Sequence, residues 1–195
     1  HVAAFSDEFW RIVENYMASM VKGGINMILT PVHTPPLDTR VGTERPTVQL
    51  VDIQKKGDSY TFDFARLKRF VDMARSCGIR YFEINHFFTQ WGAKHAPKVI
   101  ATVDGEEKRI FGWETDSCGE EYKCFLRQLI PALISFLGEI GIDRDHILFH
   151  ISDEPKLDHL ARYREVSSWF RPLIEGCTQF DALSNLDFYQ QGLVE

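Results

Sequence analysis

Two adjacent acids, Asp153 and Glu154, end the apolar stretch HILFHISDEP at residues 146–155. The stretch is typical of a buried strand, and Pro155 forces the chain out of it. In a regular strand the two side chains would point to opposite faces, but the backbone can turn at a strand terminus and bring both to one site. Carboxylates this close repel, which favours one neutral and one ionised group near pH 7. General acid catalysis needs that combination.

The same letters also suit a structural role. Acids in the first turn of a helix interact favourably with its dipole, and proline fits the first helical position. Asp153, Glu154 and Pro155 could therefore simply begin a helix. From these three residues alone both interpretations stay open.

The chain around the acids alternates between segments of helical period and short β-rich runs. Each predicted helix ends at a glycine and leads into a predicted strand, which is typical of βα repeats. Strands are expected at residues 25–30, 79–84, 147–152 and 182–186. Strands joined through helices must be parallel, and ligands bind beyond their carboxyl ends. The two acids would lie at that edge.

Caps and prolines indicate where the helices begin. Ser6 or Asp7 can cap the first helix, and Asp63 can cap the second. In the third, Pro131 should kink the helix or mark its true start. A fourth helix is expected over residues 160–174.

Two connections after predicted strands, residues 31–61 and 85–119, are unusually long. Ordinary βα loops have about 2 to 6 residues, and much longer loops in a compact domain are commonly functional. Residues 47–52 and 97–113 predict small hairpins within them, the second with an Asp104-Gly105 turn. The elaboration is expected on the face that carries the acids.

Composition describes one globular domain over residues 1–195. The chain is 44% hydrophobic and 26% charged, and its 15 Phe predict an aromatic-rich core. A complete eight-unit barrel usually needs about 250 residues. We therefore expect an α/β fold with a TIM-barrel-type parallel sheet. It would form a partial barrel of about four to five βα units, as a piece of a longer protein.

Charge and cysteine usage exclude several classes. The net charge of −6 and the scattered basic residues make nucleic acid a poor partner. No apolar run approaches the roughly 20 residues that span a bilayer. The cysteines form no Cys-x-x-Cys pair, so we expect free thiols, no metal and no cofactor; they are Cys77, Cys118, Cys124 and Cys177. Residues 1–10 lack the features of a signal peptide, and the compartment, cytoplasm or export, stays open.

Five ordered segments together carry a resemblance to a known family. They are TPVHTPPLDTRVGTERPTVQLVD, YFEINHFFTQWGAKHAPK, RIFGWETD, FHISDEP and DALSNLDFYQQGLVE. With these segments the chain resembles the bacterial proteins of domain of unknown function 4091, which are related to glycoside hydrolase family 123. The resemblance covers nearly the whole chain. It implies a barrel catalytic domain, which a β-sandwich domain precedes in full-length relatives.

The resemblance also implies a reaction. Family 123 enzymes are β-N-acetylgalactosaminidases, and the family's adjacent Asp-Glu pair falls on Asp153 and Glu154. This implies a retaining glycosidase for terminal N-acetylhexosaminides, in which the sugar's own 2-acetamido oxygen attacks the anomeric carbon. Asp153 would orient and polarise the acetamido N–H. Glu154 would protonate the leaving oxygen and later activate water.

A carbohydrate partner needs aromatic faces and fixed polar groups as well as acids. Seven residues after the predicted strands are candidates to bind it: His33, Asn85, His86, Trp91, Trp113, Asp187 and Tyr189. Each also has a structural alternative, such as loop packing for the tryptophans or a satisfied buried histidine. Glu83 could orient the acids from beneath, and His150 suits a core or supporting position.

Two other functions stay open. A metal-dependent isomerase or aldolase barrel could use His33, His86, Glu83 and Glu154 as ligands. A non-catalytic barrel could bind carbohydrate through its aromatic loops without turnover. In either case the exposed sheet edges of a partial barrel could pair two copies into a homodimer.

Overall fold

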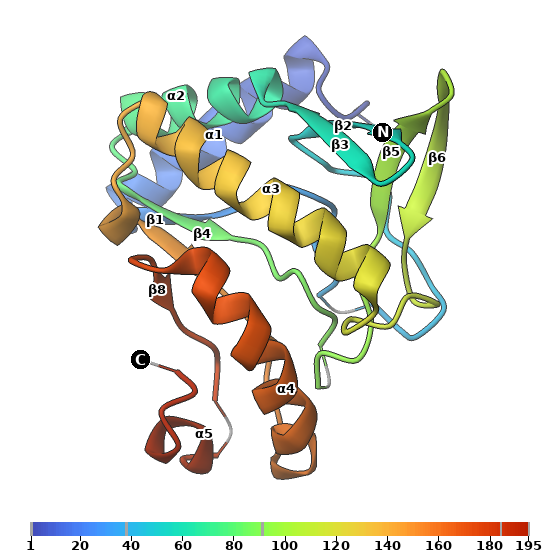
Figure 1. Ribbon diagram of the computed structural model, residues 1–195. Coiled ribbons are helices and arrows are strands. Elements are labelled where there is room, and N and C mark those ends of the chain that lie inside the picture. Colours follow the sequence, from blue (N-terminus) through green and yellow to red (C-terminus); the bar gives the residue numbers. More distant parts are fainter. Residues whose placement is uncertain (1, 38, 91, 184, 195) are drawn as a thin grey trace.

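The computed structural model describes residues 2–37, 39–90, 92–183 and 185–194. A four-stranded parallel sheet with the order β1-β4-β7-β8 lies at its centre (Figure 1). The strands are β1 (Met27–Thr30), β4 (Tyr81–Ile84), β7 (Ile147–Phe149) and β8 (Thr178–Gln179). The predicted α/β class is confirmed, and the first three predicted strands are present with shorter ends.

One helix precedes each of these strands. The helices are α1 (Asp7–Lys22), α2 (Ala65–Cys77), α3 (Glu120–Glu139) and α4 (Leu160–Phe170). A short helix follows β8, and three 3-10 turns flank β7 and α4: α5 (Asp187–Gln190), η1 (Arg144–His146), η2 (Leu157–His159) and η3 (Arg171–Ile174). The strand order follows the chain, and parallel crossovers are almost always right-handed, so we expect the connecting helices on one face of the sheet.

The two faces of the sheet differ in burial. Phe82 and Phe149 are fully buried in the core. One row of register partners is only partly buried: Leu29, Glu83, Leu148 and Thr178. Among the described residues the parallel strands form an open sheet and not a closed barrel.

The two long connections pair with each other in a second sheet of order β3-β2-β5-β6. Its strands are β2 (Asp52–Lys56), β3 (Ser59–Asp63), β5 (Val99–Val103) and β6 (Glu106–Phe111). The hairpin predicted over residues 97–113 is confirmed, and its turn has positive φ at Asp104 (54°) and Gly105 (83°), as such a turn requires. The hairpin predicted over residues 47–52 is wrong in position, because the strand pairing begins only at Asp52.

Local capping chemistry explains the helix starts. The Ser6 hydroxyl accepts the Phe9 N–H at 3.2 Å, so Ser6 is the N-cap of α1. The Asp63 carboxylate accepts the Ala65 N–H at 2.8 Å at the start of α2. Pro131 lies inside α3, so it does not mark the start of that helix.

The prediction for the last strand is wrong. A strand was expected at residues 182–186, but β8 contains only Thr178 and Gln179 and pairs with Leu148 and Phe149. Pairing with the three-residue strand β7 sets the position of β8, and local apolar content does not. The chain has left the sheet by Asp181, and residue 184 lies outside the described residues.

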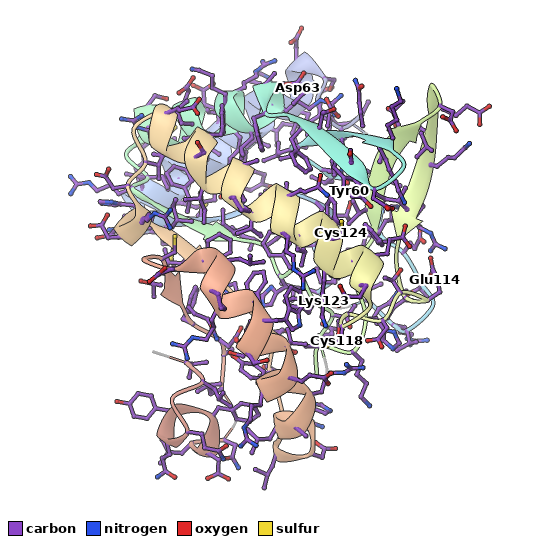
Figure 2. The ribbon with its side chains drawn as sticks, viewed as in Figure 1. Tyr60, Asp63, Glu114, Cys118, Lys123 and Cys124 are labelled. Carbon is purple, nitrogen blue, oxygen red and sulfur yellow. The ribbon has the colours of Figure 1, made fainter. Side chains whose placement is uncertain are left out.

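Aromatic side chains fill the core, as predicted. Phe87 lies 6.1 Å from Phe149 and 5.8 Å from Phe170 between ring centroids. The four cysteines are free, and Figure 2 labels Cys124 on α3 and Cys118 just before that helix. None of the described helices combines the length and the apolar character that crossing a bilayer demands.

Candidate active site at the carboxyl edge of the parallel sheet

Asp153 and Glu154 lie in the loop that follows β7, at the carboxyl edge of the sheet. Asp153 is partly buried and Glu154 is exposed. Glu154 has a φ of 43°, in the left-handed region that non-glycine residues rarely adopt. The alternation of a strand therefore stops at the acids. Backbone conformations of this kind cluster at functional sites.

The acids do not begin a helix. The first helical turn after β7 is η2, whose N-cap is Lys156, and α4 begins at Leu160. Both acids precede that cap in the chain, so the helix-start interpretation of Asp153 and Glu154 is wrong.

The two residues before the acids are fixed by hydrogen bonds to neighbouring strand ends. The Ser152 hydroxyl donates to the Thr89 carbonyl at 3.3 Å and accepts the Gly92 N–H at 3.3 Å. The Ile151 N–H points at the Asp181 carboxylate, 3.2 Å from Oδ1 and 3.1 Å from Oδ2. The loop that carries the acids is thus tied to the segments after both β4 and β8.

A buried charge cluster lies at the same edge. The imidazole of His150 sits between two carboxylates, with Nδ1 3.1 Å from Asp181 Oδ1 and Nε2 2.8 Å from Glu83 Oε1. The Tyr163 hydroxyl, from α4, also donates to Asp181. The exposed fractions of the side chains are 5% for His150, 0% for Asp181 and 23% for Glu83. One hydrogen-bond network therefore joins β4, the end of β7, α4 and the segment after β8.

Burial and charge act in opposite directions on these groups. Burial alone lowers the pKa of His150, but hydrogen bonds and negative charge from Asp181 and Glu83 outweigh it and raise that pKa to about 9. Burial raises the pKa of Asp181, although His150, Tyr163 and the Ile151 N–H oppose this. Burial also raises the pKa of the Tyr163 hydroxyl. These effects together favour the charged form of His150 at neutral pH.

Two of the predicted binding residues, His33 and Asn85, contact each other, and both are buried. Asn85 Nδ2 is 2.7 Å from His33 Nδ1, and the side chain of Asn85 also donates to the His86 carbonyl at 3.1 Å. Burial lowers the pKa of His33 to about 3, against an opposing hydrogen bond with the backbone of Thr34. A neutral His33 can accept the amide hydrogen of Asn85. The pair bridges the ends of β1 and β4.

His86 stacks on the cluster. Its ring lies 4.0 Å from the His150 ring at an interplanar angle of 20°. Burial first, and then the charges of His150 and His33, lower the pKa of His86 to about 2, so it is neutral. Its Nδ1 is buried and has no hydrogen-bond partner among the described residues.

Three of these groups could be considered as metal ligands. His86, His150 and Asp181 offer donor atoms that lie within 4.8 Å of one another. However, an imidazole nitrogen binds a metal ion in the plane of its own ring. The rings of His86 and His150 are stacked at 20°, so their nitrogen lone pairs point in parallel directions and not toward one ion. Both nitrogens of His150 also already face carboxylates. The arrangement fits an imidazolium better than a bound ion.

The ligand set of the alternative metal-dependent barrel is not brought together. His33 is paired with Asn85, and Glu83 is paired with His150. Glu154 lies exposed in the loop after β7.

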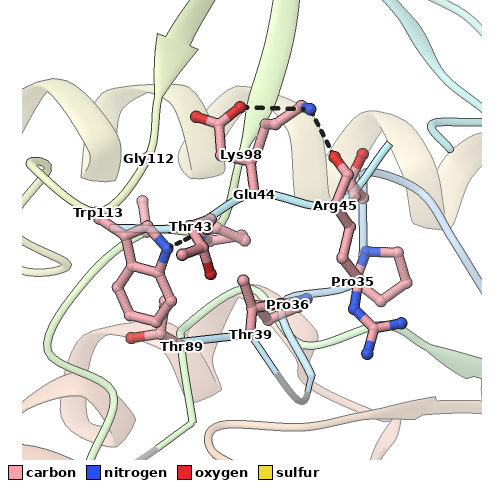
Figure 3. Close-up of a pocket in the computed structure, with 13 residues that line it drawn as sticks. Pro35, Pro36, Thr39, Thr43, Glu44, Arg45, Thr89, Lys98, Gly112 and Trp113 are labelled. Carbon is pink, nitrogen blue, oxygen red and sulfur yellow. Dashed lines mark hydrogen bonds and ion pairs between the residues drawn. The ribbon is translucent and has the colours of Figure 1, made fainter. Parts of the chain in front are cut away.

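Trp113 belongs to a pocket between the two long connections (Figure 3). Its indole Nε1 donates to the Thr43 carbonyl at 2.8 Å, and its ring meets His95 edge to face at 5.8 Å. The enclosed space is about 20 Å³, enough for about one water molecule and too small for a sugar ring. In this structure Trp113 packs the two connections together.

The remaining predicted binding residues lie further along the chain or outside the described part. Asp187 and Tyr189 are on α5, where Tyr189 is 59% exposed. The intervening Phe188 packs edge to face on Tyr163 of α4 at 5.0 Å. Because β8 ends at Gln179, these residues do not directly follow a strand as expected. Trp91 lies outside the described residues.

Two members of the cluster, Asp181 and Tyr163, were not predicted. Asp181 closely follows a strand end, as the acids after β7 do, and a correct position for β8 would have revealed it. Tyr163 lies within the fourth predicted helix, residues 160–174, and no role in the site was predicted for it. A tyrosine on the buried face of a helix usually needs a hydrogen-bond partner for its hydroxyl, and this need could have indicated a buried polar group nearby.

Comparisons with known proteins give the family of the chain and support its fold. The family model described as glycoside hydrolase 123, catalytic domain, matches residues 1–195. No curated protein matches the chain. One similar solved structure is that of a family 123 glycoside hydrolase from Clostridium perfringens, from a study of glycolipid glycan hydrolysis. It has a TM-score of 0.68 and 12% sequence identity, over 97% of this chain and 33% of that chain.

At 12% identity the structural similarity establishes the fold alone, and the chain spans about a third of the length of that enzyme. The family model, in contrast, covers every residue of the sequence. The chain therefore belongs to glycoside hydrolase family 123, within its catalytic domain.

Proposed function

We propose that this chain carries the catalytic acids of a retaining glycoside hydrolase that cleaves terminal N-acetylhexosaminides. The observation that supports this most strongly is the position of Asp153 and Glu154. The pair follows a parallel strand at the edge where ligands bind, and hydrogen bonds fix the two residues before it. Membership of family 123 gives the reaction class.

We further propose that the parallel sheet is an arc of a (β/α) barrel. Its strand order follows the chain without reversal, as in a barrel wall. The row of partly buried residues that contains Glu83 and Leu148 would then face the barrel interior. This orientation directs Glu83 and His150 toward the centre, beneath the acids.

The adjacency of the two acids favours a substrate-assisted mechanism. A retaining enzyme with a carboxylate nucleophile usually places its two carboxyl groups about 5 Å apart, on either side of the scissile bond. Asp153 and Glu154 approach a sugar from a single loop instead. The 2-acetamido group of the substrate can supply the missing nucleophile.

In the first step the acetamido carbonyl oxygen bonds to the anomeric carbon while the bond to the leaving oxygen breaks. Glu154, which is exposed to solvent, gives that oxygen a proton. Asp153 accepts a hydrogen bond from the acetamido N–H and stabilises the positive charge of the oxazolinium ion. In the second step Glu154 takes a proton from water as the water attacks the anomeric carbon. The attack opens the oxazolinium ring, and the product keeps the anomeric configuration of the substrate.

Product stereochemistry and substrate truncation test this proposal. The protein that carries this chain is incubated with an aryl β-N-acetylgalactosaminide, and with a matched β-galactoside that has a hydroxyl at C2. Proton NMR identifies the first anomer released. We expect the β anomer from the first substrate and no turnover of the second, which lacks the internal nucleophile. Initial release of the α anomer, or equal turnover of both substrates, would contradict the mechanism.

A further inference from the structure

We propose that His150 and Asp181 are positioning residues that hold the loop bearing Asp153 and Glu154, with His150 acting as a buried imidazolium between two carboxylates. The positional claim stands on hydrogen bonds alone. Its consequence for turnover rests on the proposed glycosidase function.

The donor and acceptor inventory supports the imidazolium. Ionised carboxylates only accept hydrogen bonds, and a neutral imidazole has one donor and one acceptor nitrogen. His150 faces a carboxylate oxygen with each nitrogen, at 3.1 Å on the Asp181 side and 2.8 Å on the Glu83 side. With both carboxylates ionised, satisfying both contacts requires a proton on each nitrogen. A carboxylate that is 0% exposed, as Asp181 is, also needs a nearby cation to offset its desolvation.

Asp181 connects this cation to the loop. Besides His150, it accepts the Ile151 N–H with both oxygens and the hydroxyl of Tyr163. Ile151 precedes Asp153 by two residues, so the carboxylate holds the backbone just before the acids. Loss of the Asp181 charge would leave the loop without this attachment to the segment after β8.

The surroundings of His150 keep the charge in place. The neutral ring of His86 covers one side at 4.0 Å, and Phe180 lies 4.2 Å away between ring centroids. The titratable groups that face it are Glu83 from β4, Asp181 from the segment after β8, and His86. Tyr163 of α4 reaches it through Asp181. No second cation among these described groups competes for the two carboxylates, because His86 is neutral.

The first test detects the protons on the His150 ring directly and needs no enzymatic activity. Nitrogen-15 NMR of the complete protein, with the His150 signals assigned through His150→Gln, reports protonation of both ring nitrogens. We expect both to carry protons at pH 7 and to titrate together near pH 9. A His150 ring with a single proton at pH 7 would overturn the proposal, as would displacement of that proton by added Zn²⁺ at micromolar concentration.

The second test measures how firmly the backbone before Asp153 and Glu154 is held. Amide hydrogen exchange at Ile151 should accelerate at least about tenfold in Asp181→Asn, whose amide group cannot accept from all its present donors. His146→Gln, at the opposite end of β7, is the matched control and should leave this exchange unchanged. Unchanged exchange in Asp181→Asn would show that the carboxylate does not hold the loop.

The third test reads turnover. In Asp181→Asn we expect kcat on an aryl N-acetylhexosaminide to fall about 10- to 100-fold with little change in KM, because misplaced acids harm the reaction more than binding. Asp181→Glu, which keeps the charge, should recover part of the loss. Wild-type kcat in both variants would overturn the role in turnover. If the parent protein cleaves no glycoside, the proposed function fails, while the proton and exchange measurements still decide the positional claim.

Discussion

Two histidine–aspartate pairs lie at opposite ends of β7. Their nitrogen–oxygen distances are similar, but their exposure to solvent differs. Before β7, His146 Nδ1 is 2.9 Å from Asp145 Oδ1, with side chains that are 34% and 78% exposed. After β7, His150 Nδ1 is 3.1 Å from Asp181 Oδ1, with side chains that are 5% and 0% exposed. Solvent screens the first pair and not the second. Burial, and not distance, thus decides which pair can hold a charge in place.

The comparison also separates the two ends of the sheet by role. At the amino end the acids are solvated and bind mainly their sequence neighbours. At the carboxyl end buried groups converge beside the backbone just before Asp153 and Glu154. Chemistry is therefore expected only at the carboxyl end, and matched variants at the two ends should behave differently.

The largest expected difference concerns Glu154. We expect Glu154→Gln to lower kcat/KM about 10³-fold on glycosides with poor leaving groups, because the general acid is lost. Asp145→Asn, the matched change at the amino end, should leave the rate within twofold. Steady-state kinetics on an alkyl N-acetylhexosaminide measures both. Similar rates in the two variants would remove the distinction between the ends.

Asp153→Asn should lower kcat about 10²-fold on both good and poor leaving groups. The expected reason is that an amide stabilises the oxazolinium charge less well than a carboxylate. Aryl and alkyl substrates assayed side by side measure this. A loss confined to alkyl substrates would instead assign the general acid to Asp153.

For stability, the two histidines should differ by several kcal/mol. His150→Gln leaves buried carboxylates without their cation and should lower the free energy of unfolding by about 3 kcal/mol. His146→Gln breaks an exposed pair and should change it by less than about 0.5 kcal/mol. Urea denaturation followed by circular dichroism gives both values. Equal losses would mean that burial is not the deciding factor.

The most specific expected effect is the dependence of stability on pH. The folded pKa of His150 is raised from 6.5 to about 9, so its stabilisation is fully present below pH 6.5 and is lost as pH rises toward 9. The lowered pKa values of His33 and His86 act oppositely, because stability falls as pH drops below 6.5. The free energy of unfolding should therefore peak near pH 6.5.

His150→Gln should remove the alkaline decline of that curve. It should also weaken the acid decline, because the charge of His150 contributes to the lowered pKa of His86. Thermal or urea unfolding from pH 4 to pH 10 measures the profile. An alkaline decline that persists in His150→Gln would assign it to another group.

The sequence predicted the features that local chemistry determines. The Ser6 cap and the Asp104-Gly105 turn each depend on residues close in the chain, and each is present. The position of Asp153 and Glu154 after a parallel strand followed from the same local reading. Pro131 inside α3 shows the limit, because packing of a long helix can overrule a residue that usually breaks one.

The features that were missed depend on pairing between distant segments. β8 is two residues long and exists through its register with β7, so no periodicity marks it. Asp181 joins His150 across 31 positions of sequence, and Trp113 meets the Thr43 carbonyl across 70. Such contacts are set by how the elements pack. The seven predicted binding residues accordingly stay predictions, although His33, Asn85 and His86 lie at the carboxyl edge.

The central claim is that Glu154 protonates the leaving group while the substrate supplies the nucleophile. The most direct measurement is kcat/KM for a series of aryl β-N-acetylgalactosaminides of graded leaving-group acidity, with the parent protein and with Glu154→Gln. The account predicts a shallow dependence in the parent and a steep one in the variant, with the two rates converging for the best leaving group. Parallel lines, with the variant equally slow throughout, would contradict it.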